Sequence, residues 1–369
     1  MSLAEPSIIL SAQQLTGFVA ALFEHTGTET DTAQLVAEHL VSANLKGHDS
    51  HGVGMIPAYL RNISAGFLKQ NAGIKIIRDN GAVIMLDGQA GFGQRVGREA
   101  TELAIARAKK TGIACLGLRN AHHLGRIGSY GEQCAAAGMI STHYVNVVGH
   151  APSVAPFGGR DARMVTNPFC AVVPRADGPP IVLDMATSAV ALGKVRVAYH
   201  SGTPVAEGAL VDHAGQPTTD PSVMFTEPQG SLGPFGGHKG YGLAVICELL
   251  GGALAGEWTA QPEHTRNHNI VNNMLVFVLD PAATGNTEGF QHEVRAMVDY
   301  LQECPPAAGQ DRVRVPGEPE HDTQARRISE GIPIDPSSWA SICKAALRSG
   351  FPEPDLPTPK KPIPETQTI

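Results

Sequence analysis

The chain has 369 residues, 42% hydrophobic and 17% charged, a balance that excludes a wholly disordered protein. Its formal net charge of -7 gives no basic surface for nucleic acid, and its longest apolar window, residues 241–256, is shorter than a membrane span and contains Glu248. The N-terminus carries no export signal, and the six cysteines lack paired spacing. We therefore expect a globular cytoplasmic protein with reduced thiols that acts on a small molecule, with no nucleic-acid or membrane partner.

The first 75 residues predict helices. Apolar residues at helical spacing follow Ser11, which can cap the first helix, and a second such run follows Asp31 and stops at Gly47. A third helix is expected to end at Gly66. The segment GHDSHGVG, residues 47–54, therefore lies in a turn between two helices.

A mixed sheet is expected from residue 74 onward. Two β-branched runs flank Asn80-Gly81, the strongest short signal for a hairpin, and residues 83–119 read as a strand, a helix and a strand. Further strands are expected at 139–147, 169–174, 180–184 and 273–280, with a strong helix at 241–254. The predicted fold class is therefore α/β.

The segment GFGQRVG, residues 91–97, opens a helix after a strand, where a dinucleotide-binding fingerprint would lie. Its glycine spacing is one residue too long. Arg119 and Asn120 also stand where the acid that binds the ribose is expected. Glycines at a helix start often serve packing alone, and we expect that role here.

Four polar, glycine-rich segments carry the candidate chemistry: residues 47–54, 120–131, 182–188 and 233–242. Glycine lets backbone approach a ligand closely, while His, Asp, Ser and Lys supply acids, bases and anion contacts. Together they indicate one site. Alone, each would be weak evidence.

The histidines permit two chemistries. His48 and His51 are three apart and His122 and His123 are adjacent, but no familiar zinc spacing accompanies them, so a catalytic metal is disfavoured. Proton transfer by His51 would need an orienting acceptor, and Asp184, at the end of an apolar strand, is the candidate. Two alternatives stay open: His51 as a turn residue bonded to backbone, and Asp184 as the cap of a helix that follows it.

In this order the segments resemble the malate/L-lactate dehydrogenase family of NAD(P)-dependent enzymes, which is unrelated to the Rossmann-type lactate dehydrogenases. The matching stretches include GHDSHGVGMIPAYL, NAHHLGRIGSYG, VTNPF, PIVLDMATSAVALGKV, GPFGGHKGYGLA and PGEPE. The likeness covers roughly residues 11–347. It implies a homodimer, a mixed and largely antiparallel sheet with non-Rossmann binding of NAD or NADP, and a helical domain formed by the N- and C-terminal segments.

The resemblance also implies an organisation and a set of site residues. The parts would be a helical segment (1–75), the mixed-sheet cofactor-binding part (76–285) and a C-terminal helical part packed on the first (286–349). Residues 350–369 carry six prolines and almost no apolar periodicity, which predicts an extended tail. Catalytic roles would fall on His51 as acid/base, Ser50, Asp184 as its carboxylate partner, and His123. Cofactor contacts would fall on Thr166, Asn167, Val182, Leu183, Asp184, Met185, Ala186, His238, Lys239, Gly317 and Glu318.

One departure concerns the substrate. Members of the family usually carry Arg four residues after the motif histidine, and this chain has Met55, whose thioether cannot grip a carboxylate. Tyr59 would lie on the substrate side, and Arg126, Arg61 or Arg196 could take over the anion. Alternatively, the substrate carries a larger, less anionic group at that end.

These residues predict an oxidoreductase that transfers a hydride between NAD(P) and a small 2-hydroxy acid, a 2-oxo acid or a cyclic imine. A metal-dependent hydrolase or lyase built on the histidines is the alternative. A binding protein that has lost catalysis through Met55 is a third reading. Neither the choice of NAD or NADP nor the physiological direction follows from the sequence.

Overall fold

The computed structural model describes residues 7–264, 266–267 and 269–358. It divides into two compact units: the described residues up to Asn71 together with those from Pro319 onward, and Ala72–Glu318. Among the described residues, no helix combines the length and the apolar character that a membrane span requires.

The smaller unit is helical, with one short strand pair. Its elements are α1 (Ala12–His25), α2 (Thr30–Leu45), α3 (Ile56–Ser64), α9 (Glu318–Glu330, whose first residue belongs to the larger unit), α10 (Pro336–Arg348), β1 (Ile8–Leu10) and β12 (Ile332–Ile334). Helix α10 packs on α3, and β1 pairs with β12 in antiparallel fashion. The prediction that N- and C-terminal segments form one helical part is therefore confirmed.

The predicted helix boundaries in this unit are partly right. Ser11 caps α1 through a reciprocal capping box with Gln14. The predicted cap at Asp31 is wrong, because α2 already begins at Thr30. The backbone N–H of Glu29, its N-cap, donates to Asn71 Oδ1 (2.9 Å) and fixes the start of the helix there. Asp31 instead lies in the first turn, where its charge favours the helix dipole.

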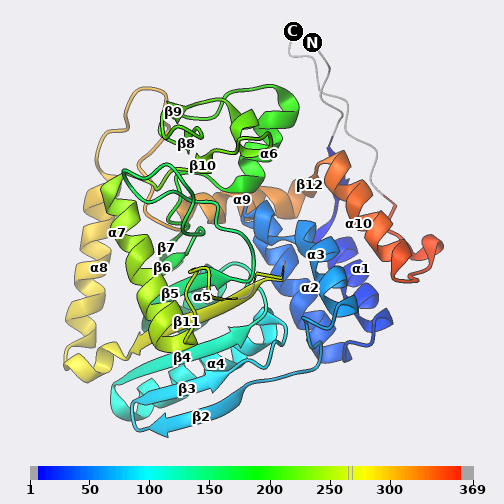
Figure 1. The fold of residues 1–369 in the computed structure, drawn as a ribbon. Helices are drawn as coiled ribbons and strands as arrows, with labels where there is room; N and C mark the ends of the chain where they lie inside the picture. Colours follow the sequence, from blue (N-terminus) through cyan, green and yellow to red (C-terminus); the bar gives the residue numbers. More distant parts are fainter. Residues whose placement is uncertain (1–6, 265, 268, 359–369) are drawn as a thin grey trace. The chain divides into compact units, whose positions relative to one another are not determined.

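The larger unit is built on a seven-stranded sheet (Figure 1). Its strands, in the order β2-β3-β4-β11-β5-β6-β7, are β2 (Lys75–Asn80), β3 (Val83–Asp87), β4 (Ile113–Ala121), β11 (Val271–Leu279), β5 (Ile140–Val148), β6 (Phe169–Val173) and β7 (Ile181–Met185). Of the neighbouring strand pairs described, β3 and β4 are parallel and the others antiparallel. The predicted mixed, largely antiparallel sheet and the hairpin at Asn80-Gly81 are confirmed.

Helices cover both faces of this sheet. Helices α4 (Gly93–Thr111) and α5 (Gly128–Ala136) pack on one face, where Ala100, Ala104 and Ala108 are fully buried against the strands. On the other face, a Cβ on Gly117 would contact Met85 of β3 and Ala255. Ala255 belongs to the helix that follows α7 (His238–Cys247). The alternation of side chains along β4 explains how one strand serves both layers.

The predicted helix at 241–254 is only partly α-helical. Helix α7 continues as a nine-residue π-helix, η4 (Glu248–Gly256), with its wider turn. A Cβ on Gly252 would lie 2.5 Å from Asn146 Nδ2, and one on Gly256 would lie 2.3 Å from Asn273 Cγ. The glycines thus let η4 lie directly on buried asparagines of the sheet, a contact that hydrophobic periodicity does not encode.

Smaller elements complete this unit. They are α6 (Leu192–Ser201), α8 (Thr287–Gln302), the sheet β10-β8-β9 (Ser231–Leu232, Leu210–Val211, Pro217–Thr218) and the 3₁₀ turns η3 (Pro221–Met224) and η5 (Pro281–Thr284). Helix α8 falls within the larger unit, whereas the organisation expected from the sequence assigns residues 286–349 to a C-terminal part. Gln291 accepts from the N–H of Ala176, and Arg295 pairs with Asp177 in the loop between β6 and β7.

Of the predicted tail, residues 350–358 are described, with a short 3₁₀ turn, η6 (Glu353–Asp355). Residues 359–369 lie outside the described chain.

Candidate functional site

The segment 47–54 forms two successive 3₁₀ turns, η1 (Asp49–His51) and η2 (Val53–Met55), between α2 and α3. This confirms the predicted turn. The Ser50 hydroxyl lies 2.9 Å from His51 Nδ1, and the His51 N–H donates to the His48 carbonyl (2.9 Å). The imidazole of His51 is partly exposed. The turn therefore presents one histidine with a hydroxyl at its Nδ1.

An interaction across the unit holds this turn in shape. Arg327 of α9 makes a two-pronged ion pair with Asp49 (2.7 and 3.0 Å), and buried Asn44 donates to Asp49 Oδ1 (2.7 Å). Asn44 Oδ1 also accepts from the N–H of Val53 (2.8 Å). A Cβ on Gly52 would lie 2.1 Å from that oxygen, so only glycine fits. Asp49 is thus structural, and no local sequence pattern predicted the roles of Asn44 or Arg327.

Two other candidate residues of this unit, His48 and Tyr59, have partners within it. His48 Nε2 lies 3.3 Å from Glu320 Oε1, an ion pair when the imidazole is protonated. The ring of Tyr59 is fully buried, with its centroid 6.3 Å from that of Phe23. Within the part of the chain that the structure describes, no group of three His, Cys, Asp or Glu side chains is arranged to hold a metal ion.

Asp184 lies at the end of β7, as the sequence predicted for a carboxylate at a strand terminus. Its Oδ2 accepts from the N–H of Gly128 (2.8 Å), the first residue of α5, and lies 3.5 Å from Arg126 Nε. The alternative that Asp184 caps a following helix is wrong. The next helix, α6, begins only at Leu192, with Ala191 as its N-cap.

Arg126 is almost completely inside the unit, with a side chain 1% exposed. Its Nη1 lies 2.9 Å from Glu132 Oε1, and its Nε faces Asp184. Burial lowers the pKa of Arg126, but the charges of Glu132 and Asp184 outweigh this and leave the pKa raised. The arginine named as a substrate ligand is therefore already engaged by two carboxylates of the protein.

The loop before α5 carries His122 and His123. His122 is 1% exposed, and burial lowers its pKa to about 3, so this imidazole stays neutral. His123 is partly exposed. A Cβ on Gly93 would lie 2.2 Å from the His123 carbonyl oxygen. At least this glycine of the 91–97 segment is required for packing, as expected.

Two of the expected cofactor residues, Thr166 and Asn167, are held by Thr187, a residue of the segment 182–188 to which the sequence analysis assigned no role. Its hydroxyl donates to the carbonyls of Thr166 (2.9 Å) and Asn167 (3.0 Å), and its carbonyl accepts from the N–H of Phe235 (3.1 Å). Phe235 is three residues before the start of α7. Thr187 therefore links three of the segments assigned to the cofactor.

Asn167 is the most unusual residue in this group. It is fully buried, with a φ of +24°, and its Nδ2 donates to Glu248 Oε2 (2.6 Å) and to the Ala244 carbonyl (3.3 Å). These two acceptors fix the orientation of the amide. Its Oδ1 is buried and accepts no hydrogen bond from any described residue. A buried acceptor in this position calls for a donor from a ligand or water.

The other expected cofactor residues lie around the same segments. His238 and Lys239 are exposed at the start of α7, whose N-cap, Gly237, offers no side chain to the first-turn amides. Val182 donates its N–H to the Pro316 carbonyl (3.0 Å), next to Gly317. Glu318 is engaged locally, because its carboxylate accepts from Gln302 (2.7 Å) and pairs with Arg312 (3.1 Å).

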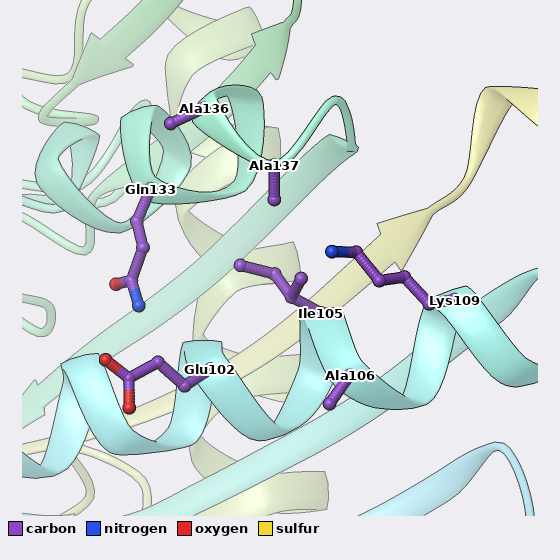
Figure 2. Close-up of a pocket in the computed structure, with 7 residues that line it drawn as sticks. All are labelled: Glu102, Ile105, Ala106, Lys109, Gln133, Ala136 and Ala137. Atoms are coloured by element: carbon purple, nitrogen blue, oxygen red, sulfur yellow. The ribbon is translucent and has the colours of Figure 1, made fainter.

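The predicted site residues are thus divided between the units. Ser50, His51 and Tyr59 belong to the helical unit, whereas His123, Arg126, Asp184 and the expected cofactor residues belong to the sheet unit. A depression of about 470 Å³ between α4 and α5 is lined by Glu102, Ile105 and Lys109 on one side and Gln133 on the other (Figure 2). None of the predicted site residues lines it.

Comparison with known proteins identifies the chain. The family described as malate/L-lactate dehydrogenase matches residues 10–343, nearly the whole chain. The chain belongs to this family. It is a dehydrogenase of a group that uses nicotinamide cofactors.

Individual relatives agree with this. The chain is 48% identical over 353 residues to hydroxycarboxylate dehydrogenase B of Escherichia coli (strain K12), covering 94% of this chain and 95% of that protein. It is 42% identical over 339 residues to an L-lactate dehydrogenase of Cupriavidus necator, covering 92% and 96%. A solved E. coli structure assigned as a malate/lactate dehydrogenase superposes with a TM-score of 0.90 at 47% identity, covering 94% and 97%.

Proposed function

We propose that this dehydrogenase transfers a hydride between NAD or NADP and a small 2-hydroxy acid, forming the 2-oxo acid, or catalyses the reverse reaction. One observation carries the proposal: the family match spans residues 10–343 and so includes every residue to which we give a role. The names of the two relatives above, a hydroxycarboxylate and an L-lactate dehydrogenase, support the substrate class.

His51 takes the proton-transfer role. In the oxidation direction it accepts the hydroxyl proton of the substrate, and in reduction it returns a proton to the oxo group. The Ser50 hydroxyl lies at Nδ1, and we therefore assign proton exchange to Nε2, the other ring nitrogen. Asp184 is the proposed carboxylate that favours the charged imidazolium, and His123 the second imidazole at the reacting centre.

The residues of the sheet unit fit a nicotinamide cofactor. Asn167 Oδ1 is a buried acceptor that needs a donor, and the carboxamide of a nicotinamide offers an N–H₂ group. The bound cofactor would supply the hydride acceptor or donor. Thr166 and residues 182–186 would line it, while the start of α7, with His238 and the ammonium group of Lys239, offers a helix N-terminus to its phosphates. Gly317 and Glu318 would complete the cofactor segment.

Met55 stands where an arginine is usual in the family, and the guanidinium of Arg126 is paired with protein carboxylates. We therefore propose a substrate whose far end is larger and less anionic than that of malate, with a cyclic imine analogue as a second class. The family resemblance puts Tyr59 on the substrate side, but its ring is fully buried in the helical unit, so we assign it no direct contact with the substrate. We also propose a homodimer located in the cytoplasm, in keeping with six cysteines that are all free.

A turnover screen tests this function. The chain is assayed with a panel of 2-hydroxy acids in oxidation, and of 2-oxo acids and cyclic imines in reduction, with NAD and NADP, by the absorbance of the reduced nicotinamide. We expect turnover that depends on a nicotinamide cofactor, and we expect that malate is not the best substrate. If malate is by far the best substrate, the proposal that Met55 accompanies a larger and less anionic substrate group is wrong. Cofactor-independent turnover abolished by a chelator would instead support a metal-dependent hydrolase or lyase.

A further inference from the structure

The environment of Asp184 suggests a role for two residues that bind neither substrate nor cofactor. We propose that Arg126 and Glu132 form a positioning pair, which holds the Asp184 carboxylate and the loop of His123 in one fixed arrangement. The inference rests on the proposed function for its catalytic consequence. The geometry on which it is built lies entirely within the sheet unit.

The geometry joins three elements. Arg126 belongs to the loop between β4 and α5, three residues after His123. Glu132 is on α5, and Asp184 is on β7. The guanidinium lies between the two carboxylates, 2.9 Å from Glu132 Oε1 and 3.5 Å from Asp184 Oδ2. The loop of His123 and the strand of Asp184 are thereby connected through one buried cation.

The fit around this cation is tight. A Cβ on Gly128 would lie 2.6 Å from Arg126 Nη2 and 2.7 Å from Asp184 Oδ2, so the two groups close around the start of α5. On the neighbouring strand, Cys170 is in register with Asp184. Burial and the Asp184 charge raise the pKa of the Cys170 thiol well above its usual range, so it stays neutral and adds no second anion.

Energetics favour positioning over substrate binding. The guanidinium is 1% exposed, so the loss of either carboxylate would leave buried N–H groups of Arg126 without that acceptor. Binding a substrate carboxylate would require it to leave Glu132 or Asp184. Both anions are fixed by the protein, and the planar guanidinium can bridge them in a way that a lysine cannot.

Two variants test the pair. Arg126→Lys keeps the charge but loses the bridge, and Glu132→Gln is nearly isosteric at a side chain 23% exposed, so it remains informative if Arg126→Lys folds poorly. Arg98→Gln breaks an exposed ion pair with Glu102 on α4 and is the matched control. For each protein, kcat and KM are measured on its best substrate, and hydrogen exchange is measured by mass spectrometry in the peptide spanning residues 122–130.

Positioning predicts that both variants lower kcat by about 10–100-fold, as a misplacement near 1 Å does, while KM for the acid stays within about threefold. Exchange of the 122–130 peptide should be faster in both variants and unchanged in Arg98→Gln. A KM raised by about 30-fold or more with kcat retained in Arg126→Lys would overturn the proposal, because it marks direct binding of the substrate carboxylate. Unchanged exchange in both variants would overturn it as well. If the wild-type chain shows no nicotinamide-dependent turnover, the proposed function has failed, and exchange alone decides the positioning.

Discussion

Glu248 provides a quantitative test of how the segments proposed to bind the cofactor are held. Glu248 lies at the junction of α7 and η4 and is 9% exposed, and three donors converge on its carboxylate. Oε2 accepts from Asn167 Nδ2 (2.6 Å), while Oε1 accepts from the Ala260 N–H (2.6 Å) and from Asn146 Nδ2 (3.4 Å). The Glu248 side chain therefore connects the amide of Asn167 to the sheet and to the loop after η4.

Glu248→Gln replaces one of these two oxygens by an N–H₂ group, whichever way the new amide turns. A charge-assisted hydrogen bond worth about 1.5–3 kcal/mol is lost, and a buried donor that faces another donor adds about 1–3 kcal/mol. We expect a net loss of about 3 kcal/mol in unfolding free energy. At about 2–4 °C per kcal/mol for a unit of this size, the Tm falls by about 6–12 °C.

The assay is thermal unfolding followed by tryptophan fluorescence, because the Trp258 carbonyl accepts from Asn146 in this network. Glu257→Gln is the control, as its side chain is 75% exposed in an ion pair with Arg119 and should change stability by less than about 0.5 kcal/mol. A Glu248→Gln protein whose Tm equals that of the control would refute the view that this carboxylate holds the network. Cofactor affinity should fall with the Tm, since Asn167 loses its support.

Three further predictions follow from the site and the core. His51→Ala should lower kcat by about 10²–10⁴-fold with cofactor Kd near wild type, and an unchanged kcat would remove its acid/base role. Lys239→Ala should raise the cofactor Kd. A change confined to the substrate KM would show that Lys239 acts on the substrate and not on the cofactor. Burial lowers the pKa of His143 from 6.5 to about 3. The stability that the neutral imidazole contributes is therefore complete above pH 6.5 and is lost as the pH falls, by about 2 kcal/mol of unfolding free energy at pH 5. The pH dependence of Tm should weaken in His143→Gln, and an unchanged slope would contradict this.

Much of the fold could be read from local patterns. The capping residue Ser11, the Asn80-Gly81 hairpin and the strands of the large sheet were predicted because each depends on residues close in sequence. The cap at Asp31 failed because a distant side chain, Asn71, fixes the first turn of α2. The prediction of a regular helix at 241–254 failed for a similar reason: Gly252 and Gly256 of η4 lie against Asn146 and Asn273, contacts that hydrophobic periodicity does not encode.

The candidate site shows the same limit. The sequence pointed to His51 and Asp184 as residue types suited to proton transfer, with their assignment drawn from a family resemblance. It did not reveal that Asp49 is held by Arg327, nearly 280 positions later, or that Arg126 is buried between two carboxylates. A charged residue in a polar segment looks the same whether it faces a substrate or another part of the chain, and only its burial and its partners distinguish the two.

The central claim is that His51 and Asp184 serve one proton transfer. The most direct test is a double-mutant cycle on kcat with His51→Ala, Asp184→Asn and the double variant, all with the best substrate. If the two side chains act as a unit, Asp184→Asn lowers kcat by about 10²-fold or more in the wild-type background but by less than about threefold when His51 is already absent. If the two losses multiply in the double variant, the residues act independently, and the proposed mechanism is wrong.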